Sequence, residues 1–432
     1  MRIFLGFSPA LRLNLLFLFI GGLCFWAGLA GLLPALPLYI GEFGATGQQI
    51  GWVMGCFGVG LLAIRPQMAK LADNRGRKVV LMVGLSAIAA APLGYWLVAY
   101  CPDWTISLSG SETGWQIDIR ILLLMVMRAF HGISIAAYVT AYSALIVDLA
   151  PPGSRGELIG YMSLVNPLGM ALGPALGGFL VDSAGFQAVF LVTGGLGLVG
   201  LMVSSRVVET IKPAIAKPSS SKESQLFWRL ILTPRVRIPS LILLLVGLAF
   251  GALATFIPLY VQELELELNV GLIYAASALT SFIVRFLVGS ASDRHGRGRF
   301  ITLSLLLYTL AMTVMWLAQS SSFLILGGLI QGAAAGTLIP MIAALMADRS
   351  QADERARIFG LCMVGFDVGI AVAGPVFGQL ADVIGYRSIF GMSAVMTFIG
   401  LFIFVTTSSK DVAHSLRFAL SHGRDVYAID QA

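Results

Sequence analysis

Long apolar runs alternate with short polar segments along almost the whole chain. An α-helix rises about 1.5 Å per residue, so about 20 apolar residues cross the ~30 Å hydrocarbon core of a bilayer. Such runs predict an all-α integral membrane protein with twelve transmembrane helices. Their ranges are roughly 13–40, 48–72, 78–100, 119–147, 156–181, 186–205, 238–261, 271–292, 299–319, 322–347, 357–381 and 386–407. An even number of spans places both termini on one side of the membrane.

The chain consists of two related halves. The segment 73–78 closes the second apolar run, and a similar segment, 293–299, closes the eighth, 220 positions later. Further along, equivalent residues are 200 positions apart: Asp148 and Asp348, Gly169 and Gly369, Asp182 and Asp382, and Gly185 and Gly385. The 20-residue difference matches the polar segment 101–118, which only the first half contains. Internal duplication therefore predicts two pseudo-symmetric six-helix bundles.

Polar segments divide the chain into predicted domains. An N-terminal bundle covers 1–205, a linker 206–237, a C-terminal bundle 238–408 and a tail 409–432. The linker contains prolines, a serine run and basic residues, which favour an extended segment. A short surface helix is expected around Leu226–Leu232.

The basic residues report topology. With 57% hydrophobic and 12% charged residues, the chain lies outside the composition of soluble domains. The first apolar run is longer than a signal-peptide core, so we expect it to remain as a mature helix. Of 28 Lys and Arg, 23 fall in segments that a single orientation places in the cytoplasm. This asymmetry predicts cytoplasmic termini, and it explains the net charge of +6 without a nucleic-acid partner.

Metal and nucleophile patterns are missing from the sequence. The four cysteines show no CxxC spacing, and there is no HExxH, GxSxG or Walker-type glycine loop. We therefore expect no metal site, no cofactor and no direct use of ATP. An integral membrane enzyme or lipid transferase is kept as a remote alternative.

The repeated basic loop has a definite expected geometry. Asp73 ends a helix, Gly76 permits a tight reversal with positive φ, and Arg77 starts the next helix. The carboxylate can lie against the N-terminal end of a neighbouring helix, and the arginines can reach acids such as Asp148 or Asp348. We expect such contacts to hold the two halves together on the inner face. The second copy offers the same set. Its residues are Asp293, Gly296 and Arg297. A basic turn that only fixes topology is the alternative for a single copy.

Two ionisable residues lie deep within apolar runs. Arg128 lies about 13 Å into the fourth helix and Asp367 about 15 Å into the eleventh. Intramembrane charges are costly, so they face the bundle interior and are functional by default. We predict Arg128 and Asp367 as proton-coupling candidates, with helix packing as the alternative for each. We expect His131, Asn166 and Gln331 to line the cavity, with helix packing as the alternative for the histidine and the two amides.

The loop carries a family resemblance. Residues 69–78 resemble the first signature of the major facilitator superfamily, Gly-x-Leu-Ala-Asp-Arg-x-Gly-Arg-Lys. Ala69 and Asn74 depart from that signature, whereas the second copy keeps both the leading glycine and Arg294. The resemblance covers essentially the whole chain. It implies that this loop latches the outward-open state.

Two further motifs extend the resemblance. Arg128 and Gly132 resemble the family's Arg-x-x-x-Gly signature, which is linked there to proton transfer. The fifth and eleventh helices resemble the glycine-proline signature that the family associates with antiporters. The matching residues are Gly169, Gly173, Pro174, Gly177, Gly374 and Pro375. Close packing of small residues is the alternative explanation.

The resemblance implies a secondary transporter whose two bundles rock around a central cavity. Among its members the chain is most similar to bacterial drug and small-metabolite efflux permeases. This similarity implies a monomer in the bacterial inner membrane that exports a small molecule in exchange for protons. A facilitator or proton-coupled importer on the same fold is the alternative.

Overall fold

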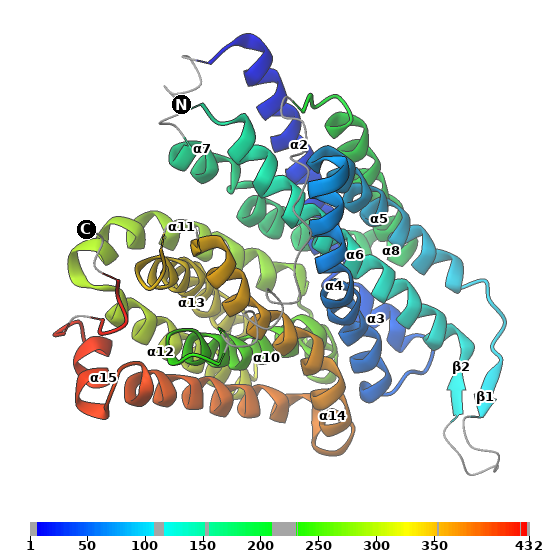
Figure 1. Ribbon diagram of the computed structural model, residues 1–432. Coiled ribbons are helices and arrows are strands. Elements are labelled where there is room, and N and C mark those ends of the chain that lie inside the picture. Colours follow the sequence, from blue (N-terminus) through cyan, green and yellow to red (C-terminus); the bar gives the residue numbers. More distant parts are fainter. Residues whose placement is uncertain are drawn as a thin grey trace. The chain divides into compact units, whose positions relative to one another are not determined.

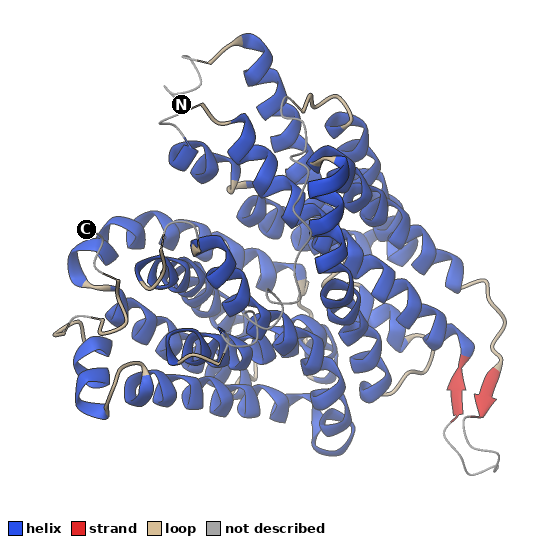
Figure 2. Cartoon of the chain, viewed as in Figure 1, coloured by secondary structure: helices blue, strands red, loops and turns tan. Residues whose placement is uncertain are grey.

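The computed structural model describes residues 7–107, 116–151, 155–209, 230, 232–351, 354–423 and 425–429. Almost all of these residues are helical (Figures 1 and 2). Ten continuous stretches within them are long and apolar enough to cross a membrane. Two of these, 157–204 and 358–407, are broken by non-helical backbone at Gly185 and Gly385 and each contain two spans. The described residues thus provide the twelve predicted spans.

The first compact unit comprises Met1–Pro218 with Asn269–Gly271. Its helices are α2 (Pro9–Gly31), α3 (Leu36–Gly41), α4 (Gly47–Arg75), α5 (Arg77–Val98), α6 (Ile119–Leu149), α7 (Arg155–Met162) and α8 (Val165–Ser204). The short strands β1 (Thr105–Ser107) and β2 (Gln116–Asp118) pair antiparallel. In the core of this unit, Phe25 stacks on Tyr138 with ring centroids 3.8 Å apart.

The second unit comprises Ser219–Leu268 with Leu272–Ala432. Its helices are α10 (Pro234–Glu263), α11 (Gly271–His295), α12 (Arg297–Trp316), α13 (Ser321–Asp348), α14 (Arg355–Thr407) and α15 (Val412–Ala419). The side chains of α10, α12, α13 and α14 form its core. The fully buried Tyr308 and Ile342 and the nearly buried Phe404 and Phe418 belong to it.

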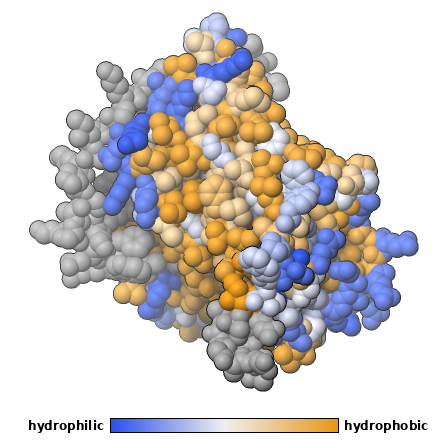
Figure 3. Space-filling model, turned by 90° about the vertical axis from the view of Figure 1, so that its right-hand side faces the viewer, coloured by the Kyte–Doolittle hydropathy of each residue, from blue (hydrophilic) through white to orange (hydrophobic). Residues whose placement is uncertain are grey.

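The outer surface is apolar, as a bilayer requires. Large hydrophobic side chains are widely exposed, including Val59, Phe179, Phe286 and Phe402. Figure 3 shows a face covered mainly by hydrophobic residues, with hydrophilic ones gathered toward its margins. Because every helix satisfies its own backbone hydrogen bonds, such surfaces can face lipid directly.

The helix pattern was predicted well, and the short elements were not. The polar segment 101–118 contains the β1–β2 hairpin, and the tail contains α15. The first predicted span is interrupted between α2 and α3, at residues 32–35, where Pro34 lacks a backbone N–H donor. Most of the linker, with most of the expected helix around Leu226–Leu232, lies outside the described residues, so the predicted domain limits stay a prediction.

Candidate functional site

The first basic loop has the expected reversal. Gly76 joins α4 to α5 with φ of +98°, and Gly296 joins α11 to α12 with φ of +84°. This left-handed backbone favours glycine, so the predicted positive φ is confirmed at both positions. A Cβ at Gly76 would lie 2.8 Å from Oε2 of Glu209. The loop is therefore shaped around an acidic neighbour.

Glu209 stabilises the start of α5. Its carboxylate accepts hydrogen bonds from the backbone N–H of Arg77 at 2.8 Å and of Lys78 at 3.2 Å. N–H groups in the first turn of a helix have no acceptor within the helix. A carboxylate at this positive end stabilises the helix by about 0.3–1 kcal/mol. Sequence reasoning missed Glu209, although it is the first acidic residue after the sixth span.

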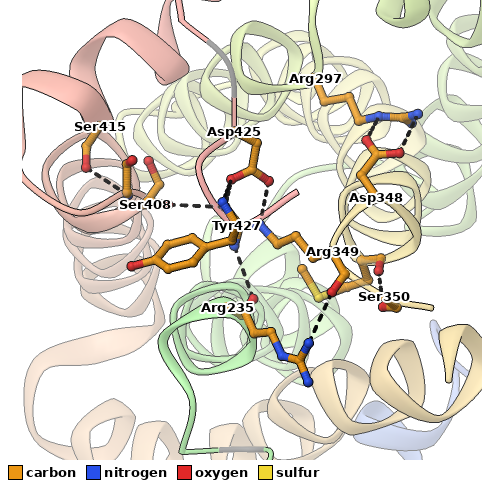
Figure 4. Close-up of polar contacts among 11 residues, drawn as sticks. Arg235, Arg297, Asp348, Arg349, Ser350, Ser408, Ser415, Asp425 and Tyr427 are labelled. Carbon is orange, nitrogen blue, oxygen red and sulfur yellow. Dashed lines mark hydrogen bonds and ion pairs between the residues drawn. The ribbon is translucent and has the colours of Figure 1, made fainter. Parts of the chain in front are cut away.

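The loop arginines pair with the predicted acids, but each pair lies inside one unit and does not join the two halves as expected. Arg77 forms an ion pair with Asp148 at the end of α6. Arg297 pairs with Asp348 at the end of α13, with Nη2 3.2 Å from Oδ1 (Figure 4). Each pair ties the start of one helix to the end of the next. Asp73 lies at an exposed position, and the Asp293 side chain is outside the described set, so the latch remains a prediction.

In the second unit the C-terminal tail covers the equivalent helix start. The backbone N–H of Arg299 donates to Ser421 Oγ at 3.1 Å, which parallels the Glu209 contact. The Thr302 hydroxyl donates to the Ala419 carbonyl at 3.0 Å. The predicted tail is therefore partly a packed element of the second bundle.

Arg349 anchors this tail from a fully buried position (Figure 4). Its Nε and Nη2 donate to the two carboxylate oxygens of Asp425 at 2.6 and 3.0 Å. Nη1 and Nη2 also donate to the carbonyls of Arg235 and Ser408, each at 3.1 Å. The Tyr427 ring centroid lies 5.1 Å from the guanidinium carbon. One guanidinium thus joins the start of α10, the end of α14 and the tail.

The variant Asp425→Asn should unfold at a lower temperature than the parent protein. It removes one charge from a buried bidentate pair, which should cost about 1–3 kcal/mol. Thermal unfolding in detergent measures this change, and Asp103→Asn, at an exposed loop position, is the control. An unchanged midpoint for Asp425→Asn would show that the tail contact does not stabilise the second unit.

Arg128 lies in a buried polar cluster of the first unit. Only 6% of its surface is exposed, and its guanidinium carbon lies 4.6 Å from the Phe57 ring centroid. Its Nη1 is 3.3 Å from Nδ1 of His131, and the Tyr95 hydroxyl is 3.0 Å from the same nitrogen. The Tyr39 hydroxyl in turn donates to the Tyr95 carbonyl at 2.8 Å. The cluster joins α3, α5 and α6 and includes Tyr95, which the sequence did not single out.

The geometry defines the state of His131. A guanidinium has donors only, so Nδ1 of His131 must accept, which places the ring proton of the neutral imidazole on Nε2. Within the described chain, Nε2 of His131 and Nε of Arg128 have no hydrogen-bond partner. No ion pair joins Arg128 to a carboxylate in that part of the chain either. An unsatisfied buried donor costs about 1–3 kcal/mol, so a hydrogen-bond acceptor that reaches these two donors would be bound favourably.

The second unit contains its own buried polar residues. Asp367, in α14, is 7% exposed. Gln331, in α13, is buried, and its Oε1 accepts from the Ser277 hydroxyl of α11 at 2.5 Å. This bond ties two helices together, which favours the packing alternative for Gln331. Asn166 is half-buried near the start of α8 in the first unit.

The glycine motif brings helices into close contact. Added Cβ atoms at Gly169, Gly173 or Gly177 of α8 would overlap backbone atoms of α2 between Trp26 and Gly31. Small-residue spacing of this kind lets two backbones approach closely. Pro174 lies within the same stretch of α8, and Gly374 and Pro375 lie in α14. Close packing against α2 explains the three glycines of α8. The antiporter role implied by the resemblance stays a prediction.

No group of three or more His, Cys, Asp or Glu suited to a metal ion occurs among the residues for which the structure gives positions. The cysteines at 24, 56, 101 and 362 are all free thiols.

The sequence matches a known protein family and named relatives. The family model described as Major Facilitator Superfamily matches residues 18–290 and 265–420. The multi-drug resistance efflux pump PmrA homolog of Lactococcus lactis subsp. lactis is 28% identical over 398 residues, which cover 87% of this chain and 90% of the relative. The multidrug resistance protein MdtG of Escherichia coli is 27% identical over 401 residues, which cover 88% and 91%.

Solved structures share the fold at low sequence identity. The nucleoside transporter NupG superposes with a TM-score of 0.68 at 12% identity, covering 90% of this chain and 99% of that one. A bacterial homolog of the human lysosomal transporter Spinster gives a TM-score of 0.66 at 15% identity, covering 99% and 100%.

Proposed function

The chain belongs to the major facilitator superfamily, and we propose that it exports small amphipathic molecules across the bacterial inner membrane in exchange for protons. The observation that carries this proposal is the pair of buried ionisable groups, Arg128 in one unit and Asp367 in the other. The multidrug names of the two relatives favour efflux of varied amphipathic compounds. The twelve spans serve as the scaffold, and the protein acts as a monomer.

In this mechanism Asp367 exchanges a proton with whichever side of the membrane it faces. A carboxylate this deep is stable only when protonated or paired, so its proton occupancy can be linked to the direction in which the bundles open. The free donors of Arg128 and His131 offer hydrogen bonds to an acceptor group of the substrate. Proton entry then accompanies substrate exit.

A facilitator or importer is the second candidate. The observation that favours it is that only one acid of the sequence, Asp367, lies well inside an apolar run, so proton coupling depends on a single candidate. The fold shared with the nucleoside transporter is compatible with this candidate but shows architecture alone.

Transport in intact cells tests the proposal. A bacterial strain without its own drug pumps should accumulate less of one or more amphipathic dyes when it expresses the protein. A protonophore should abolish this difference. Uptake that is raised by the protein and unaffected by the protonophore would favour the facilitator, and the Asp367→Asn variant provides the reference that lacks proton coupling.

The proposed orientation makes its own prediction. In a cysteine-free background, a cysteine at Ser111 should react with an impermeant maleimide added outside, and one at Ser220 should react only after the cells are opened. Both positions lie outside the described residues, in the polar segment 101–118 and in the predicted linker. Equal labelling of both from outside would overturn the cytoplasmic placement of the linker.

A further inference from the structure

A groove of about 580 Å³ lies between α5 and α6 of the first unit. Its wall is formed by Lys78, Val79, Met82, Val83, Ser86, Ala87, Phe130 and Ile133. The core-facing residues of α5, among them Val80, Leu81 and Leu85, are fully buried, whereas Val79 is 42% exposed. Ser86 is also exposed, so the groove opens on the side of α5 away from the core, although Ala87 in its wall is buried.

The length of the groove corresponds to one leaflet. From Lys78 to Ala87 the helix rises about 14 Å, close to half of the ~30 Å hydrocarbon core. Between these residues the wall is apolar except for Ser86. An extended acyl chain of one leaflet fits such a wall, because it offers apolar surface over this depth and needs no hydrogen bonds.

One end of the groove carries a positive charge. Lys78 is the second residue of α5, and no ion pair or hydrogen bond of its ammonium group is found among the described residues. Two charges beside it are already engaged: Arg77 pairs with Asp148, and the Glu209 carboxylate accepts from backbone N–H groups. Of the residues that line the groove, Lys78 alone carries a charge, and its ammonium can meet an anionic group at this level of the membrane.

The start of α12, which corresponds to the start of α5, has different neighbours. Gly298 and Thr302 correspond to Lys78 and Met82, and both contact the C-terminal tail at Phe418 and Ala419. Both tail residues are buried. In the first unit Glu209 caps this helix start, but the described residues show no counterpart of α15, and a lysine stands where the second unit has glycine.

We propose that this groove binds one anionic phospholipid, with an acyl chain along α5 and the phosphate at Lys78. In the proposed orientation the lipid belongs to the cytoplasmic leaflet, where anionic headgroups attract basic side chains by about 1 kcal/mol each. The site is separate from the transport chemistry of Arg128 and Asp367.

Native mass spectrometry of the purified full-length protein tests this site. The delipidated protein is titrated with palmitoyl-oleoyl phosphatidylglycerol and, separately, with the matching phosphatidylcholine. We expect one phosphatidylglycerol to bind about fivefold more tightly than phosphatidylcholine, the ratio that about 1 kcal/mol gives. Lys78→Gln should remove this preference, and Ser86→Phe, which fills the groove, should weaken binding of both lipids.

Matched controls separate the groove from the rest of the surface. Leu306→Phe changes the position in α12 that corresponds to Ser86, and Lys410→Gln removes an exposed lysine of the tail. Neither should alter the first bound phosphatidylglycerol. Binding that responds to these controls as strongly as to the groove variants, or equal affinity for the two lipids in the parent protein, would overturn the proposal. Ser86 is exposed, so its variant should fold, as gel filtration would verify.

Discussion

The variant Asp367→Asn should lose proton-driven accumulation of substrate while it still exchanges substrate down a gradient. Asp367 lies twelve residues after the start of α14, about 18 Å along the helix, and is 7% exposed. An amide resembles the protonated carboxyl in shape but cannot release a proton. The bundles can therefore still alternate around bound substrate, but no proton gradient can drive the cycle.

Proteoliposomes separate these two activities. With an imposed pH gradient, the parent protein should concentrate substrate, and Asp367→Asn should only equilibrate it. The matched control is Asp382→Asn, an exposed position of the same α14, which should keep coupled transport. If Asp367→Asn still concentrates substrate, the coupling role is wrong and a packing role should replace it.

Features that depend on local pattern were predictable. Apolar runs of bilayer length predicted the spans. In lipid every backbone N–H and C=O group needs a hydrogen bond within the protein, and a single apolar run meets this need by forming a helix. The glycine at position 76 and its equivalent at 296 gave the positive φ, since few other residues tolerate that backbone. The pairing of Arg77 with Asp148 followed from the repeat, in which both members recur together.

Features that depend on distant partners were not predictable. Arg349 and Asp425 are 76 positions apart, and no repeated partner marks them in the first half. The helix α15 has only eight residues, too few for a rule based on bilayer thickness. Glu209 follows α8 as an ordinary linker acid, and its role becomes visible only when the start of α5 is placed beside it.

The polar cluster around Arg128 shows the same limit. The three-residue spacing of Arg128 and His131 placed them on one helix face, because residues three apart are neighbours on an α-helix. Tyr95 comes from α5, and no local pattern links it to that pair. The sequence therefore identified the charge but not the residue that, with His131, holds it in position.

The variant His131→Leu should reduce transport by about 10–100-fold, and His131→Gln should retain most of it. Leucine leaves Nη1 of Arg128 and the Tyr95 hydroxyl without their shared acceptor, and each unpaired buried donor costs about 1–3 kcal/mol. Glutamine keeps an acceptor oxygen for both donors and an N–H group in place of Nε2. Initial rates of substrate exchange in proteoliposomes measure the difference without a contribution from proton coupling.

A matched tyrosine pair distinguishes positioning of Arg128 from general stability. Tyr95→Phe removes the hydroxyl beside His131, whereas Tyr142→Phe removes a buried hydroxyl that donates to the Met162 carbonyl at 3.0 Å in the same unit. Both should lower the unfolding temperature by similar amounts, but only Tyr95→Phe should also raise the substrate concentration needed for half-maximal transport. If the two variants transport alike, or if His131→Leu keeps the parental rate, the cluster supports the fold and does not orient Arg128 toward substrate.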